Sequence, residues 1–247
     1  MGKVVVLISA DAEWRAVRML LPCANIGSSP YGEWFAAEIR ATLVGQKIYT
    51  LAAEYEPDAG VIFMQGGWGK IAAAGSTQFA LDRWNPHLLV NLGTCGGFEG
   101  EVNRGETLLV DRTVVYDIVE QMGDFEEHIA HYTTDIDLSW LGDRLPYTAR
   151  RSLLVSADRD LLVEDLPLLK ERYGAIAGDW ESGAIAWVAM RSQARLLILR
   201  GVTDLVSPAG GEAYGNIARF HQATGEIMQR LLDELPDWVA HGLCRQA

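Results

Sequence analysis

The sequence predicts an α/β fold, built as a mainly parallel or mixed β-sheet flanked by helices. Short apolar runs rich in β-branched residues alternate along the chain with stretches that have helical apolar spacing. The apolar runs are continuous rather than alternating, which indicates strands covered on both faces. Nothing between them has the composition of a linker, so we expect residues 1–247 to form a single domain.

The apolar runs place the expected strands at residues 4–8, 61–64, 88–92, 107–110, 153–155 and 196–199. Helical spacing predicts helices at 11–21, 70–84, 165–173 and 181–190, and a C-terminal helix at 217–235. Residues 39–51 are expected to add a hairpin. The polar and aromatic segment 117–151 has no clear period and is predicted to be a long loop region that covers the substrate.

The charge of the chain restricts its partners. A formal net charge of -12 argues against nucleic acid or an anionic membrane, so we expect a small-molecule partner. No apolar run reaches the roughly 18 residues of a membrane span, and the start of the chain has no cleavage-type tail. The cysteines Cys23, Cys95 and Cys244 are odd in number and lack metal-ligand spacing. We therefore expect a cytoplasmic protein without a disulfide framework and without metal.

A first glycine cluster, Gly67-Trp-Gly69-Lys-Ile-Ala72, has the G-x-G-x-x-A form of a dinucleotide fingerprint. It follows an expected strand and opens an expected helix. The fingerprint also needs an acid after the next strand, but that strand ends in Asn91-Leu-Gly. The other interpretation is a tight turn in which glycine permits close packing. A nicotinamide-dependent oxidoreductase remains an alternative, and dinucleotide binding would distinguish it.

A second cluster, Gly93-Thr-Cys95-Gly-Gly, has the shape of the nucleophile elbow of α/β hydrolases. With Asp204 and then His221 or His241 downstream, the order nucleophile, acid and histidine can be written. A lone cysteine at a strand end is more often a small buried apolar residue. A cysteine-dependent acyl hydrolase is therefore a second alternative, and it requires that the Cys95→Ala variant be inactive.

Three carboxylates suggest a different chemistry. Glu13 stands at the start of the first helix, Glu181 at the start of a later helix, and Asp204 near the end of a late strand. In a parallel sheet all three could meet at one edge, although each alone is more often a helix cap or first-turn acid. Cleavage of an N-glycosidic bond needs an acid for the leaving base, a base for the nucleophile, and contacts to a sugar that becomes oxocarbenium-like.

Six motifs then carry a family resemblance over nearly the whole chain. They are Ala10-Asp-Ala-Glu13, Gly67-Trp-Gly-Lys-Ile-Ala-Ala73, Asn85-Pro-His-Leu-Leu-Val-Asn-Leu-Gly-Thr-Cys-Gly-Gly97, Gly105-Glu-Thr-Leu-Leu-Val-Asp111, Asp179-Trp-Glu181 and Arg200-Gly-Val-Thr-Asp204. In order and spacing they resemble the 5'-methylthioadenosine/S-adenosylhomocysteine nucleosidases of the purine nucleoside phosphorylase and uridine phosphorylase superfamily. The resemblance implies a central twisted mixed sheet surrounded by helices, a purine nucleoside substrate, no cofactor, and a homo-oligomer, either a dimer or larger.

The resemblance also assigns roles. It makes Glu13 the base that activates water, Asp204 the acid that protonates the purine, and Glu181 the residue that grips the ribose hydroxyls, held by Arg200. Thr94 takes a position usually held by Ser near the catalytic acid. The further substrate-binding residues expected on this basis are Asp160, Leu161, Asp179, Trp180, Thr203 and Tyr214, of which Tyr214 stands where the family has an aromatic residue over the substrate's 5' end.

Two departures from the family pattern bear on the substrate. Asp160 stands where the nucleosidases have a Phe that stacks on adenine, and a charged side chain cannot stack. Trp180 replaces a methionine beside the sugar. Asp204 still favours a purine, because pyrimidines lack the ring nitrogen that takes its proton. We expect an adenine nucleoside first, and a hypoxanthine-type compound such as futalosine second.

The nucleophile is the last question that the sequence raises. Related phosphorylases bind phosphate partly through an Arg at the position of Asn91, and Glu13 would repel an anion. We therefore expect hydrolysis. A phosphate-dependent phosphorylase remains an alternative, because Arg15 and Arg18 follow Glu13 closely and could bind phosphate. Asp160 also motivates an alternative of another class, a non-catalytic nucleoside-binding or storage protein.

Overall fold

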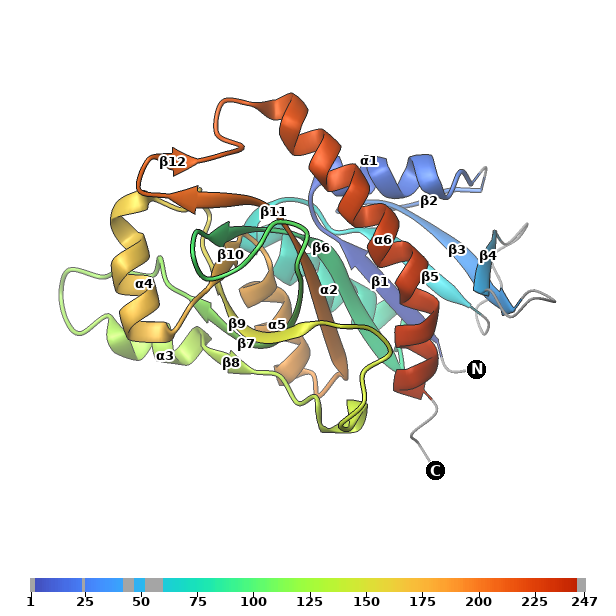
Figure 1. Ribbon diagram of the computed structural model, residues 1–247. Helices are drawn as coiled ribbons and strands as arrows, with labels where there is room; N and C mark the ends of the chain where they lie inside the picture. Colours follow the sequence, from blue (N-terminus) through green and yellow to red (C-terminus); the bar gives the residue numbers. More distant parts are fainter. Residues whose placement is uncertain (1–2, 24, 42–46, 52–59, 244–247) are drawn as a thin grey trace.

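A large mixed β-sheet runs through the molecule, with helices on both of its faces (Figure 1). The computed structural model describes residues 3–23, 25–41, 47–51 and 60–243, and in residues 40, 41 and 47–51 only the backbone. The described strands are β1 Val4–Ile8, β2 Gly27–Ser29, β3 Gly32–Ala41, β4 Lys47–Leu51, β5 Val61–Gln65, β6 Leu88–Phe98, β7 Thr107–Val115, β8 Thr134–Asp135, β9 Arg150–Ser156, β10 Ala177–Asp179, β11 Leu196–Ser207 and β12 Gly210–Gly211. The helices are α1 Asp11–Leu20, α2 Gly69–Trp84, α3 Glu126–Tyr132, α4 Leu166–Tyr173, α5 Ser182–Arg191 and α6 Ile217–Leu243, with short 3-10 turns at Ser139–Leu141 and Val163–Asp165.

The strand order is β12-β11-β7-β9-β10-β6-β1-β5-β3-β2, with β4 added to β3 and β8 to β7. Strand β11 also pairs with β6, so β6, β10, β9, β7 and β11 close into a ring. The pairs β1–β5, β1–β6, β6–β11 and β7–β9 are parallel, whereas β7–β11 and β6–β10 are antiparallel. The mixed α/β architecture expected from the sequence is confirmed, as a single α/β domain over the described ranges.

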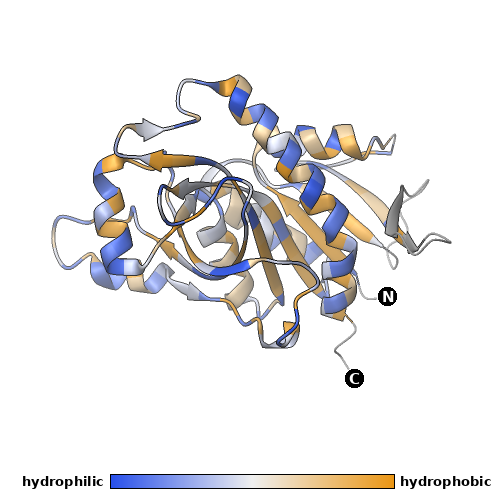
Figure 2. Cartoon of the chain, in the orientation of Figure 1, coloured by the Kyte–Doolittle hydropathy of each residue, from blue (hydrophilic) through white to orange (hydrophobic). Residues whose placement is uncertain are grey.

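Helices α1 and α6 lie against one face of the sheet, and α2 and α5 against the other (Figure 1). Strand β1 is buried along its whole length, as expected for a strand covered on both sides. Apolar residues concentrate in the central strands, and α6 has both apolar and polar residues along its length (Figure 2). No helix within the described ranges is both long and apolar enough to cross a membrane.

Two strands extend well beyond their expected ends. Strand β6 was expected to stop at Leu92 and β11 at Leu199, yet they run on to Phe98 and Ser207. The glycines and polar residues that suggested strand ends lie inside the β6–β11 pair, where Gly93 pairs with Arg200 and Thr94 with Gly201. Tertiary partners satisfy these polar groups, so the backbone does not have to turn toward water.

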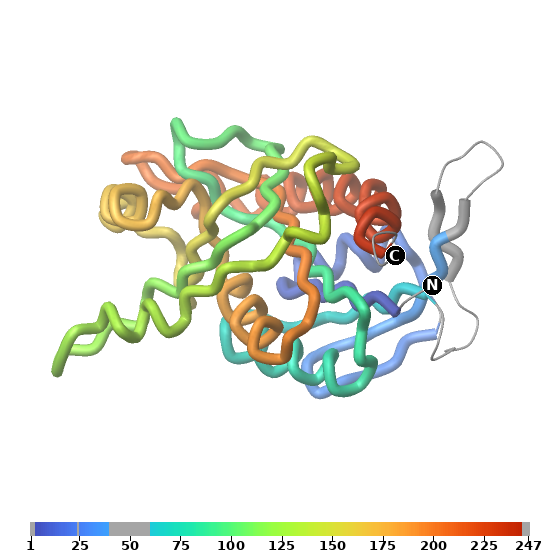
Figure 3. Tube along the Cα trace, turned by 90° about the horizontal axis from the view of Figure 1, so that it is seen from below, coloured from blue at the N-terminus to red at the C-terminus, as the bar shows by residue number. Residues whose placement is uncertain are grey.

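The segment expected to be a long loop, residues 117–151, contains α3, β8 and a 3-10 turn. In Figure 3 the part around α3 extends away from the sheet, at the end opposite β3. The hairpin expected at 39–51 is present as the antiparallel pair β3–β4, and its residues 42–46 lie outside the described ones. The helix expected at 217–235 continues to Leu243. Strand β10 was not expected, because three residues give no readable period.

Candidate active site

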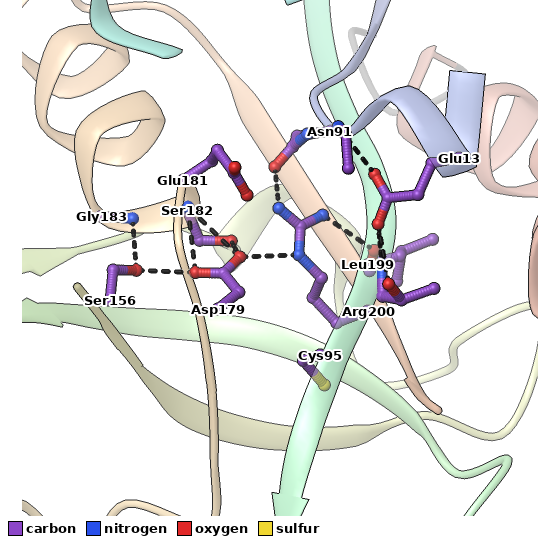
Figure 4. Close-up of polar contacts among 12 residues, drawn as sticks. Glu13, Asn91, Cys95, Ser156, Asp179, Glu181, Ser182, Gly183, Leu199 and Arg200 are labelled. Carbon is purple, nitrogen blue, oxygen red and sulfur yellow. Dashed lines mark hydrogen bonds and ion pairs between the residues drawn. The ribbon is translucent and has the colours of Figure 1, made fainter. Parts of the chain in front are cut away.

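A buried guanidinium forms the centre of the site. Arg200 on β11 is 2% exposed, and its Nε donates to Asp179 Oδ2 at 2.8 Å. Its Nη2 donates to Asn91 Oδ1 at 2.5 Å, and its Nη1 to the Leu199 carbonyl oxygen at 3.4 Å. Figure 4 shows Arg200 between Asp179 and Asn91, with Glu13 and Glu181 on opposite sides in this view. A buried charge needs such partners, because desolvation otherwise costs several kcal/mol.

Asp179 ends β10 and is held by more donors than any other acid of the site. Ser156 Oγ donates to its Oδ1 at 2.7 Å, and the Ser182 N–H and Oγ donate to the same carboxylate (Figure 4). The Ser182 N–H belongs to the first residue of α5, so Asp179 also caps that helix. These bonds and Arg200 occupy both oxygens, and Asp179 is therefore a structural anchor of the site.

Glu13 lies near the start of α1 and reaches across to β6. Its Oε1 accepts bonds from the Thr94 N–H at 2.6 Å and the Thr94 hydroxyl at 2.9 Å, and its Oε2 accepts from the Ala10 N–H at 3.3 Å. Burial raises the pKa of Glu13, and the charge of Arg200 and the Thr94 bonds offset part of this effect. A Cβ at position 93 would come within 2.8 Å of Glu13 Oε1, so glycine lets the carboxylate approach β6.

Glu181 immediately precedes α5 and is 8% exposed. Within the described ranges its carboxylate has one hydrogen bond, from the Gly69 N–H to Oε1 at 3.0 Å. Burial, and then the negative charges of Asp179 and Glu13, raise the pKa of Glu181 to about 8. The expected contact between Arg200 and Glu181 is wrong, because the Arg200 guanidinium bonds to Asp179 instead. The charge of Arg200 still lowers the pKa of Glu181, against the larger effects that raise it.

Asp204 lies inside β11, next to a register shift between Val202 and Asp204. It is 7% exposed, and the Thr203 hydroxyl lies 2.7 Å from its Oδ1. Burial raises the pKa of Asp204, while the Thr203 hydroxyl and the Ala213 N–H favour the ionised form. The Thr94 hydroxyl, expected near the catalytic acid, forms its hydrogen bond with Glu13. A buried carboxyl of raised pKa is suited to donate a proton.

Three of the remaining expected residues gather near Asp204. Leu161 is buried, and its carbonyl oxygen accepts a bond from the Tyr214 hydroxyl at 2.8 Å. Asp160 is exposed, and its charge adds to burial in raising the pKa of both Asp204 and Tyr214. Trp180 lies between the two acids of its motif and is 38% exposed. Asp160 is thus a charged side chain at the position where the sequence predicted that no ring stacks on the base. Trp180 and Tyr214 are partly exposed aromatic side chains elsewhere in the candidate site.

The two alternatives drawn from glycine clusters find little structural support. Cys95 lies within β6 rather than on a sharp turn, and its Sγ lies 3.8 Å from the Gly201 carbonyl oxygen. Burial and the nearby acid Asp179 raise the pKa of the thiol, which disfavours the nucleophilic thiolate. The Gly67–Gly69 turn does open α2, but the Gly69 N–H, which a pyrophosphate would need as a donor, already bonds to Glu181 Oε1. Cys23 and Cys95 are free thiols, and Cys244 lies outside the described residues.

The sequence motifs did not reveal several partners of the site. Asn91 donates to the Leu7 carbonyl oxygen through Nδ2 at 2.9 Å, which fixes its Oδ1 toward Arg200. Ser156 and Ser182 hold Asp179, and backbone N–H groups of Gly69 and Ala213 hold the other acids. Backbone donors leave no side-chain signal in a sequence. Among the described residues no group of three or more His, Cys, Asp or Glu is arranged to hold a metal ion.

Comparison with known proteins identifies the family to which this fold belongs. Residues 38–235 match the Phosphorylase superfamily, and the chain belongs to it. It is 31% identical over 150 residues to a 5'-methylthioadenosine/S-adenosylhomocysteine nucleosidase of Thermotoga maritima, covering 59% of this chain and 66% of that protein. The nucleosidase of the same name from Oceanobacillus iheyensis is 24% identical over 186 residues, covering 71% and 80%.

Solved structures show the same architecture. The apo 5'-methylthioadenosine nucleosidase of Arabidopsis thaliana matches with a TM-score of 0.71 and 20% identity, covering 96% of each chain. The futalosine hydrolase of Helicobacter pylori matches with a TM-score of 0.69 and 14% identity, covering 96% of this chain and 98% of that one. These likenesses establish the nucleoside phosphorylase fold for this chain, including the central mixed sheet implied by the resemblance.

Proposed function

We propose that this protein is a purine nucleosidase that hydrolyses the N-glycosidic bond of an adenine-type nucleoside, 5'-methylthioadenosine or S-adenosylhomocysteine. The observation that carries the proposal is a division among buried acids. Glu13 and Glu181 lie near Arg200, while Asp204 lies further along β11 with its own donors. Two separate acidic positions can serve the two sides of a glycosidic bond.

In this mechanism Asp204 donates a proton to the departing purine. The bond between the sugar carbon and the base nitrogen breaks, and the sugar becomes oxocarbenium-like. Glu13 accepts a proton from water, whose oxygen then bonds to the sugar carbon. The Thr94 donors fix one oxygen of Glu13, and the Ala10 N–H is the longer bond to the other. Glu181 accepts bonds from the ribose hydroxyls, and the Gly69 N–H orients it.

Water rather than phosphate is the proposed nucleophile, because nearby cations already have partners. Arg200 is bonded to Asp179 and Asn91. Arg15 is exposed and pairs with Asp11, so it does not point to an anion site. Arg18 donates to the Cys23 carbonyl oxygen at 3.2 Å and pairs with Glu33. A phosphate beside Glu13 would meet a carboxylate, and Arg200, the guanidinium whose charge acts on Glu13, is already bonded to Asp179 and Asn91. The phosphate-dependent phosphorylase is thus the less supported alternative.

The base and the 5' substituent are less constrained. Asp160 near Asp204 favours a base that offers hydrogen-bond donors over one held by stacking alone. Futalosine hydrolysis is the second candidate reaction, supported by the likeness in fold to the Helicobacter pylori enzyme. The proposal includes a single domain over residues 1–247, a homo-oligomer, cytoplasmic action in nucleoside catabolism such as methionine salvage, and no cofactor. The alternative of another class is a non-catalytic nucleoside-binding or storage protein.

A nucleoside panel tests this proposal. Pure protein is incubated with 5'-methylthioadenosine, S-adenosylhomocysteine, adenosine, inosine, futalosine and uridine, and the released base is measured by chromatography. We expect adenine from the first two and no uracil. Release of hypoxanthine from futalosine alone would select the second reaction. Binding of a nucleoside that stays intact after long incubation would select the storage protein instead.

A further inference from the structure

The start of α2 is capped by distant acids. Trp68 holds the N-cap position but makes no side-chain cap bond, and the first turn contains no acid. The Gly69 N–H donates to Glu181 Oε1 at 3.0 Å, and the next amide, of Lys70, donates to Asp158 Oδ1 at 2.8 Å. The first amides of a helix have no partners within the helix and attract negative groups. Two consecutive backbone N–H groups therefore donate to two different carboxylates, those of Glu181 and Asp158.

The side chain of Lys70 fastens this arrangement. Its ammonium donates to both carboxylate oxygens of Asp117 and lies 3.5 Å from Asp158 Oδ2. The Asp158 N–H in turn donates to Asp117 Oδ2 at 3.0 Å. Lys70 and Asp117 are mostly shielded, with side chains 19% and 18% exposed. Without the Lys70 ammonium the carboxylates of Asp117 and Asp158 would repel each other. This repulsion would weaken the hydrogen bond from the Lys70 N–H to Asp158.

The turn that carries the Gly69 amide has little rigidity of its own. Gly67 and Gly69 have φ angles of +80° and +73°, which glycine adopts readily in both the folded and the unfolded chain. A Cβ at position 69 would lie 2.8 Å from Asp158 Oδ1, so the turn packs directly on that carboxylate. The contact to Asp158 is thus a restraint on the direction of the neighbouring Gly69 N–H.

We propose that Lys70, together with Asp117 and Asp158, is a positioning group for Glu181: it fixes the first turn of α2 so that the Gly69 N–H holds the carboxylate toward the ribose. This inference rests on the proposed function for its effect on the reaction. The three residues touch neither substrate nor reacting atoms. They act on Glu181 through one backbone hydrogen bond, from the Gly69 N–H. Among the described residues this N–H is the one hydrogen-bond donor to the Glu181 carboxylate.

The test compares Lys70→Met with Lys70→Arg, which keeps the charge, and with Lys170→Met as a matched control. Lys170 also forms an ion pair, with Glu101 at 3.3 Å, but its partners Glu99 and Glu101 lie outside the site. Hydrogen exchange of the peptide covering residues 64–72 is measured first. We expect the Gly69 and Lys70 amides to exchange about tenfold faster in Lys70→Met, with little change in the other two variants.

The second measurement is the titration of Glu181 by carbon-13 NMR, with its signal assigned by its loss in Glu181→Gln. Losing the Gly69 donor disfavours the ionised form, so its midpoint should rise by about one pH unit in Lys70→Met. In kinetics, the ratio of kcat/KM for a ribonucleoside over its 2'-deoxy analogue should fall about tenfold, mainly through KM. A role in folding alone would leave the titration and this ratio unchanged.

Unchanged exchange, or faster exchange with an unmoved Glu181 titration, overturns the inference. If Lys70→Met does not fold, Asp158→Ala removes the acceptor of the Lys70 amide and must give the same three changes. If the wild-type protein cleaves no nucleoside, the proposed function fails, and the exchange and titration measurements still decide whether the Lys70 group positions Glu181.

Discussion

The site has two halves that differ in how its acids are held. The inner half comprises Glu13, Thr94, Asp179, Glu181 and Arg200, which are connected through a buried guanidinium and short hydrogen bonds. The outer half comprises Asp160, Leu161, Asp204 and Tyr214, in which Asp160 is exposed and Tyr214 is 44% exposed. The inner half contains a buried balancing cation. In the outer half Asp204 has the Thr203 hydroxyl, the Ala213 N–H and the charge of Arg219, whose side chain is 47% exposed.

This difference indicates where function can vary. A buried ion network loses several kcal/mol when one member is removed, so its members constrain one another. An exposed charge such as Asp160 is screened by water and can change at small cost. We infer that the inner half sets the chemistry on the sugar and water, and that the outer half adjusts which base is accepted.

The largest effect is expected at Arg200. The Arg200→Met substitution leaves Asp179, Glu13 and Glu181 buried without their cation, which should lower the free energy of unfolding by about 3–5 kcal/mol. Urea denaturation measures this loss. Arg104→Met is the control, because the Arg104 side chain is 50% exposed and its pair with Glu212 is worth about 0–1 kcal/mol. Equal effects of the two substitutions would remove the distinction between a buried network and a surface pair.

The next largest effects are expected on turnover. Asp204→Asn removes the proposed proton donor, and kcat should fall by about 10²-fold or more with the fold intact. Glu13→Gln should lower kcat similarly while leaving binding of the nucleoside largely in place, because the proposed role of Glu13 is to activate water. Steady-state kinetics measures kcat of both variants, and equilibrium binding measures whether Glu13→Gln still binds the nucleoside. A Glu13→Gln protein that binds poorly but turns over normally at saturation would make Glu13 a structural cap.

Stability should depend on pH through Glu181. Its pKa is about 8 in the folded protein against 4.5 as the ordinary value, so folding is favoured by protonation. The contribution is complete below the unfolded pKa and is lost as pH rises through 8. Glu181→Gln, which mimics the protonated form, should therefore gain at least about 1 kcal/mol over the wild type at high pH and little at low pH. Denaturation curves across this range that stay parallel would contradict the assigned shift.

The smallest effect is expected from Asp160→Asn. Loss of this charge should lower the pKa of Asp204, so that the decline of kcat at alkaline pH begins at a lower pH. The displacement should be well under about one pH unit and should shrink with added salt, because Asp160 is exposed. A pH profile recorded at low and high ionic strength measures it. A loss of activity as large as that of Asp204→Asn would give Asp160 a direct part in catalysis.

The sequence allowed much of this architecture to be predicted. The buried strand β1 has the predicted bounds, and the acids Glu13, Glu181 and Asp204 do lie at the same part of the sheet. The apolar runs report burial on both faces, which is a local property of the chain. That is why the strands and helices were readable without any knowledge of their neighbours.

Pairing between residues distant in sequence was not readable in the same way. Asp179 and Glu181 are two positions apart, and only the direction in which β10 ends decides that Arg200 bonds to the first. The glycines of β6 suggested a turn, because their packing partners, Leu161 in the loop after β9 and Val202 on β11, are remote in sequence. Backbone donors, such as the Gly69 N–H on Glu181, have no side chain for a motif to record.

The central claim is that water guided by Glu13, and not phosphate, displaces the purine. The most direct measurement is turnover of 5'-methylthioadenosine in phosphate-free buffer made with oxygen-18 water, followed by mass spectrometry of the sugar product. The account predicts one oxygen-18 atom on the released sugar and a rate that added phosphate does not raise. A phosphate-dependent rate that yields an unlabelled sugar 1-phosphate would contradict it.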